Sequence, residues 1–151
     1  MKNYLYLLTL LIVLPIASGQ STGVKDFMRW SPEEGQWKED PDAPGTYSKT
    51  VTGSASTGNW NVYVKVNSGA RINWHWHRNS QTMYIVSGAM EYEVKPHPPM
   101  RLTLGSYVVV PAHALHNGTC VSQEPCTFFI ENLLPNDKHM TDAGGNEIKR
   151  Q

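Results

Sequence analysis

Apolar and polar side chains alternate along Trp60–Val66, where every second residue is apolar and bulky. Residues two apart share one face of a strand, so this pattern predicts a strand with one buried face. Four other segments are rich in β-branched and aromatic residues: Gln81–Val86, Ala89–Lys95, Ser106–Val110 and Thr127–Leu133. Turn-forming residues separate these segments at 67–69, 87–88, 97–99 and 117–118. Short, closely spaced strands predict an all-β antiparallel sandwich or barrel, without room for βαβ crossovers.

The first nineteen residues do not fit this pattern. Lys2 is followed by an apolar run from Tyr4 to Ile16 and then by the small residues Ala17-Ser18-Gly19. The run is too short for a membrane-spanning helix, which needs roughly 20 residues. We interpret residues 1–19 as a secretory signal peptide and expect a secreted or periplasmic protein, with no membrane association after cleavage. An uncleaved N-terminal anchor is the alternative.

Three further segments are expected after the signal peptide. Residues 20–45 are polar and rich in proline, with Trp30 and Trp37 as isolated aromatic anchors, and should form an arm over the domain. Ser31 and Pro32 could open one helical turn there, as cap and first helical residue. Residues 46–135 should form the barrel. Residues 136–151 are polar and are expected to fray as a C-terminal tail.

Composition narrows the function classes. The 151 residues are enough for one domain, and 40% of them are hydrophobic, which argues against a wholly disordered chain. Thirteen basic and 13 acidic side chains give a net charge of zero, which argues against nucleic-acid binding through broad phosphate neutralisation. Cys120 and Cys126 flank a turn-like segment, so in an oxidising compartment we expect a disulfide between them. Two separate buried thiols are the alternative.

Histidines carry the candidate chemistry. In an extended Arg71–His77 segment, Asn73, His75 and His77 would share one face, and Trp74 and Trp76 the other. Two imidazoles on one face can both reach one ion at about 2.0–2.1 Å. Gln81 begins the next expected strand, and His116 follows the strand that ends at Val110.

The spacing of these residues resembles the cupin family. Its first motif matches Gly69-x5-His75-x-His77-x3-Gln81-x6-Gly88, with Gln81 where the family usually has Glu. Its second motif matches Gly105-x5-Pro111-x4-His116. The resemblance implies an antiparallel double-sheet jelly-roll barrel that holds one divalent ion: zinc, iron, manganese, nickel, copper or cobalt. Its ligands would be His75, His77, Gln81 and His116.

Two departures from the family bear on chemistry. Gln81 makes the ligand set electrically neutral, so the ion would keep its full charge and act best as a Lewis acid. His113 stands where the family usually has glycine. It is a candidate proton-transfer group, and a turn residue at the rim is the alternative. Met83, Phe128 and Tyr63 could line the cavity or belong to the core, whereas His97 and His139 should be exposed.

The resemblance implies a metalloenzyme acting on a small polar or carbonyl-containing molecule, of isomerase, lyase or cyclase type. An oxygen-dependent dioxygenase and a non-catalytic small-molecule-binding protein are the alternatives. Trp74 and Trp76 would lie on the outer face of a two-sheet barrel. A homodimer partner, the N-terminal arm or simple packing could cover them.

Overall fold

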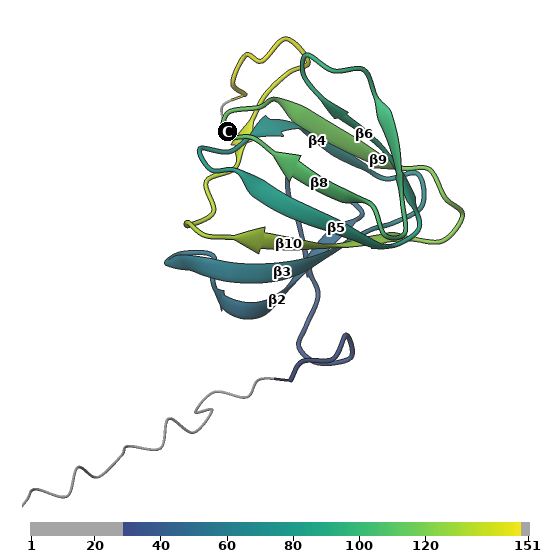
Figure 1. Cartoon of the computed structure of the whole chain (residues 1–151), viewed down its shortest axis with the longest axis vertical. Helices are drawn as coiled ribbons and strands as arrows, with labels where there is room; N and C mark the ends of the chain where they lie inside the picture. Colours follow the sequence, from purple (N-terminus) through teal and green to yellow (C-terminus); the bar gives the residue numbers. More distant parts are fainter. Residues whose placement is uncertain (1–28, 149–151) are drawn as a thin grey trace, which may run out of the picture.

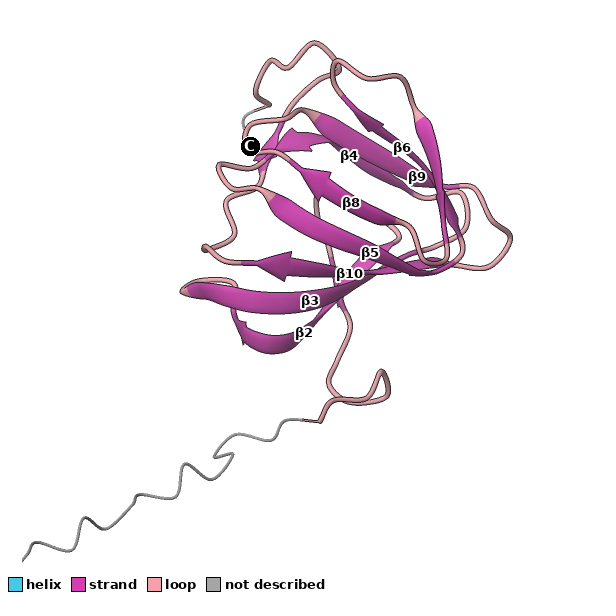
Figure 2. Ribbon diagram, in the orientation of Figure 1, coloured by secondary structure: helices cyan, strands magenta, loops and turns pink. Residues whose placement is uncertain are grey.

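The computed structural model describes residues 29–148, and this part of the chain is built from strands and loops (Figures 1 and 2). The strands are β1 (Lys38–Glu39), β2 (Thr46–Ser54), β3 (Gly58–Val66), β4 (Arg71–Trp76), β5 (Gln81–Ser87), β6 (Ala89–Val94), β7 (Met100–Thr103), β8 (Tyr107–Val110), β9 (His116–Cys120), β10 (Cys126–Asn132) and β11 (His139–Met140). No helix within residues 29–148 is long and apolar enough to cross a membrane. The expected signal peptide lies outside the described residues.

The strands form two antiparallel sheets that face each other (Figure 1). The six-stranded sheet has the order β1-β2-β3-β10-β5-β8, and the five-stranded sheet has the order β11-β4-β9-β6-β7. Strand β3 carries the predicted alternation, because Val62, Val64 and Val66 are buried while the residues between them are partly exposed. Phe128 and Met90 meet these valines in the core. The predicted all-β double-sheet architecture is confirmed.

The N-terminal arm packs on the outer face of the six-stranded sheet. Trp30 stacks on Tyr63 with ring centroids 4.9 Å apart. The Lys49 ammonium lies 4.7 Å from the centre of the Trp37 ring and donates to the carbonyl of Pro32 at 2.7 Å. Tyr63 therefore faces the arm and not the cavity. A single turn forms at Ser31, where Glu34 N–H donates to the Ser31 carbonyl at 2.9 Å, and it does not continue into a helix.

The C-terminal segment also belongs to the barrel, so the expectation that it frays is wrong for the residues described. Strand β11 pairs with β4, with His139 opposite Trp76. The two rings stack with centroids 3.8 Å apart and planes 2° apart. This pairing buries much of the His139 side chain, which is 24% exposed, and covers Trp76 without the arm. His97 is exposed, as expected.

A disulfide joins the ends of β9 and β10, as the sequence predicts. The Cys120 and Cys126 Cα atoms are 5.7 Å apart, and both side chains are fully buried. The turn from β5 to β6 passes close to this bridge at Gly88, whose φ is 75°. A β-carbon on Gly88 would lie 2.8 Å from Cys126 Cα, so only glycine fits there without displacement.

Candidate metal centre

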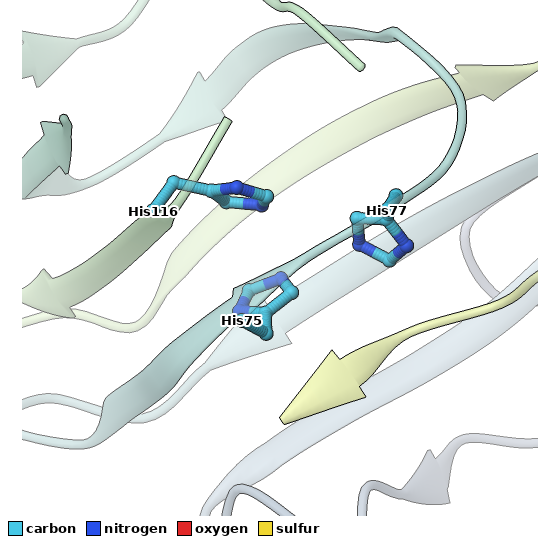
Figure 3. Close-up of side chains that lie close together, drawn as sticks. All are labelled: His75, His77 and His116. Carbon is cyan, nitrogen blue, oxygen red and sulfur yellow. The ribbon is translucent and has the colours of Figure 1, made fainter. Parts of the chain in front are cut away.

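Three histidines from neighbouring strands meet inside the barrel (Figure 3). Pairing of β4 with β9 places His75 opposite His116, and His77 follows two residues after His75. One ring nitrogen from each histidine lies within 4.8 Å of the others. The three side chains are buried, with 6%, 7% and 2% exposure for His75, His77 and His116. The structure thus brings together the three imidazoles that the sequence predicts.

A bulge in β4 decides which residues accompany them. Asn73 and Trp74 together lie opposite Asn117 alone, since Ile72 pairs with Gly118 and His75 with His116. An extra residue in one strand reverses the alternation of faces. Ile72 therefore lines the cavity, and Asn73 points outward, where its Nδ2 donates to the Asp42 carbonyl at 3.0 Å. The expectation that Asn73 shares the face of His75 is wrong for this reason.

Hydrogen bonds fix the tautomers of two imidazoles. His75 Nδ1 lies 2.7 Å from the Asn73 carbonyl oxygen, and His116 Nδ1 lies 2.7 Å from the Ala114 carbonyl oxygen. A carbonyl oxygen only accepts, so each Nδ1 must carry the proton and each Nε2 keeps its lone pair for a ligand bond. His77 Nδ1 lies 3.6 Å from Asp137 Oδ1, which favours the same tautomer.

Burial keeps these imidazoles neutral. It lowers the pKa of His75 well below the ordinary value of 6.5, with the neighbouring His116 and His77 as further causes. It lowers the pKa of His77 to about 4, aided by His116 and opposed by Asp137. It also lowers the pKa of His116 to about 4, opposed by the hydrogen bond to Ala114. Neutral imidazole is the form that binds metal, so the site is set for an ion at neutral pH.

A hydrogen bond from the amide nitrogen of Gln81 leaves its amide oxygen available to bind an ion. Its Nε2 donates to Asn132 Oδ1 at 3.0 Å, and its side chain lines the same cavity as the three histidines. Three buried imidazole nitrogens and an amide oxygen suit a divalent transition-metal ion. The residues that the sequence singles out as ligands therefore fit such an ion.

The cavity in front of the histidines has a volume of about 150 Å³. A cavity of this size in another protein admits a benzene-sized molecule. Its walls are mainly apolar and include the expected Met83 and Phe128. Tyr92 also lines it, and burial raises the pKa of Tyr92, so the hydroxyl remains a proton donor.

Two charged residues in the cavity wall come from segments outside the sequence motifs. Asp40 precedes β2 and Lys138 precedes β11, and their carboxylate and ammonium groups lie 2.5 Å apart. Sequence reasoning missed both, because nothing in the arm or the tail sets them apart from other charged residues there. By contrast, Glu91 and Glu93 on β6 are not among the residues that line the cavity.

His113 has the backbone geometry expected at the rim turn, with a φ of 62°. Its N–H donates to the His77 carbonyl at 2.7 Å. Its ring is exposed and packs against Trp76 at 5.0 Å between centroids, apart from the residues that line the cavity. The backbone of His113 therefore lies beside the candidate ligand His77, but its imidazole lies outside the cavity, against Trp76. Proton transfer by His113 stays a prediction that this geometry does not favour.

The sequence matches a family model described as the ChrR cupin-like domain over residues 26–134. This match covers most of the chain and all four candidate ligands. Comparison with curated protein sequences gives no significant match.

Several solved structures share the fold. KdgF from Halomonas sp. has 25% identity and a TM-score of 0.61, with 74% of this chain and 97% of that chain covered. The polyketide cyclase RemF from Streptomyces resistomycificus has 13% identity and a TM-score of 0.65, with 77% and 86% covered. The DMSP lyase DddQ from Ruegeria pomeroyi DSS-3 has 20% identity and a TM-score of 0.60, with 70% and 60% covered.

Proposed function

The chain belongs to the cupin family, and we propose that it is a secreted or periplasmic metalloenzyme that binds one divalent transition-metal ion. Its ligands are His75, His77, Gln81 and His116. The substrate is a small polar or carbonyl-containing molecule, and the reaction is of isomerase, lyase or cyclase type. The cyclase and the lyase among the structural neighbours support this choice of reaction types, since both share the fold.

The observation that carries the proposal is the preorganised set of three imidazoles. Their Nδ1 atoms face a carbonyl or carboxylate oxygen, and one ring nitrogen of each lies within 4.8 Å of the others. Buried histidines that only filled space would have no need to converge on one point of a cavity. An ion site requires neutral imidazoles whose ring orientation is fixed by a hydrogen bond at the nitrogen that does not bind the ion.

The remaining cavity residues have roles that follow from their chemistry. A bound divalent ion would supply Lewis-acid polarisation of a substrate oxygen. Tyr92 holds a proton at its hydroxyl and can donate it to a ligand oxygen as a hydrogen bond. The apolar walls formed by Val62, Met83 and Phe128 exclude water from the substrate. Because all four ligands are neutral, no ligand carboxylate competes for a substrate proton.

Elemental analysis of the purified protein tests the metal site. We expect about one divalent ion per chain, lost in His116→Ala and in His77→Ala. His97→Ala is the matched control, because His97 is exposed and should retain the ion. Equal metal content in all four proteins, or none in the wild type after incubation with zinc, nickel, manganese or ferrous ions, would contradict the proposal.

Reaction type needs a separate assay on the metal-loaded protein. We expect product formation without oxygen uptake from small carbonyl-containing substrates, and loss of that activity in His116→Ala. Oxygen consumption that depends on the ion would instead assign the protein to the dioxygenases. Tight retention of a small molecule without turnover would assign it to the non-catalytic binding proteins.

A further inference from the structure

Part of the cavity wall combines a lysine with a buried hydroxyl that has no hydrogen-bond partner among the described residues. Lys138 is 13% exposed at its side chain, and its ammonium donates to Asp40 at 2.5 Å. Thr46 is 3% exposed, and its Oγ1 has no hydrogen-bond partner within residues 29–148. Both residues line the same cavity as the three histidines. We call Asp40, Thr46 and Lys138 the lysine end of the cavity.

Asp40 connects the other two residues of the lysine end. Its N–H donates to the Thr46 carbonyl at 2.8 Å, and its Oδ2 accepts from Lys138. Its Oδ1 accepts from the Asp42 N–H at 2.9 Å, so both carboxylate oxygens have donors. Asp40 is therefore fixed as the counter-ion of Lys138.

Lys138 and Thr46 have hydrogen-bond donors that the described residues do not use. An ammonium group has three N–H donors, and Lys138 uses one of them on the described residues. The Thr46 hydroxyl adds another donor. Buried donors without acceptors are costly, so these groups fit a ligand that brings oxygen acceptors. Lys138 is also the one lysine or arginine among the described residues of the cavity wall.

We propose that the lysine end binds the carboxylate of the ligand, through Lys138 and Thr46, while another oxygen of that ligand faces the three histidines. This inference rests on the proposed function and adds the substrate class: a small monocarboxylate about the size of a benzene ring or less. A dianion such as phosphate fits less well, because it would meet one ammonium group already shared with Asp40.

The test compares pyruvate with diacetyl, which have equal numbers of non-hydrogen atoms. Pyruvate carries a carboxylate where diacetyl carries an acetyl group. Binding is followed by ligand-observed NMR titration, with the protein both metal-free and zinc-loaded. We expect the wild type to bind pyruvate more tightly than diacetyl. Lys138→Met should weaken pyruvate binding about tenfold or more, since charged hydrogen bonds contribute most at buried sites. Thr46→Val should weaken it about two- to tenfold.

Asp40→Asn separates carboxylate binding from a structural role of the ion pair. It breaks the same pair as Lys138→Met, but it removes the anion that competes for the ammonium. We therefore expect Asp40→Asn to tighten pyruvate binding severalfold. If the pair were only structural, both variants would weaken binding together. Lys38→Met, which removes an exposed lysine on β1, is the charge-matched control and should change nothing.

Equal affinity of the wild type for pyruvate and diacetyl, or an unchanged preference in Lys138→Met, would overturn the carboxylate subsite. Failure of both ligands to bind the zinc-loaded wild type would overturn it as well. These outcomes are distinguishable from failure of the proposed function, because zinc content is measured separately. A protein that takes up no zinc but still prefers pyruvate through Lys138 would retain the subsite and lose the metal site.

Discussion

Acidification of the metal-free protein should destabilise it through its buried histidines. The perturbation is a change from about pH 7 to about pH 4. His116 has a pKa of about 4 when folded, against 6.5 as the ordinary value expected when unfolded. Between these two values the unfolded chain binds more protons than the folded chain, so the free energy of unfolding rises with pH and is lost as pH falls.

The magnitude follows from the gap between the two pKa values. For one such histidine, the loss between about pH 7 and about pH 4 is about 3 kcal/mol. His77 has a pKa near the same value and should contribute a comparable loss. His75 has its pKa lowered too and adds to the effect in the same direction. Because carboxylates also titrate near pH 4, the total loss is not specific to these groups.

A variant isolates the contribution of one histidine. His116→Asn removes one titrating group while keeping a polar side chain in the cavity. Urea unfolding of metal-free wild type and variant at both pH values gives two losses of stability, and the wild-type loss should exceed that of the variant by about 3 kcal/mol. His97→Asn, at an exposed position, should match the wild type. Equal losses in the wild type and His116→Asn would refute the reasoning.

Three further predictions concern the surroundings of the site. Replacing Cys120 and Cys126 by Ala should lower the free energy of unfolding by about 2 kcal/mol, measured by urea titration, and an unchanged midpoint would contradict this. Gly88→Ala should destabilise by well over ~1 kcal/mol because of its contact with Cys126, whereas Gly69→Ala, with a similar φ and open space, should cost about 1 kcal/mol in thermal unfolding. Asp137→Asn should lower metal affinity about 10–100-fold in a chelator competition, because its carboxylate lies 3.6 Å from Nδ1 of the proposed ligand His77. An equal affinity would disprove a role of Asp137 in orienting His77.

Motif spacing was enough to predict the three histidines of the candidate metal centre, and for two of them the reason is local geometry. His75 and His77 are one strand period apart, so any strand through them puts both imidazoles on one face. His116 begins a strand that pairs beside them. The rest of the wall could not be predicted in this way. Asn73 lies two residues before His75 but faces outward, because a bulge reverses the alternation of faces before His75. No local sequence pattern predicts this bulge.

Alternation of side chains along single segments predicted the strands and an antiparallel sandwich or barrel, and the turn-like segment between Cys120 and Cys126 predicted the disulfide. The resemblance to the cupin motifs, which have fixed spacing, predicted the double sheet and the three imidazoles. Tertiary structure alone decided that the arm and the tail complete the cavity. Asp40 and Lys138 are 98 residues apart and meet only because β1 joins one sheet and β11 the other. Long-range pairing of this kind depends on how two sheet edges come together in space, which no pattern within either segment encodes. The sequence therefore located the candidate metal centre, and the fold placed beside it the charged pair on which the carboxylate proposal rests.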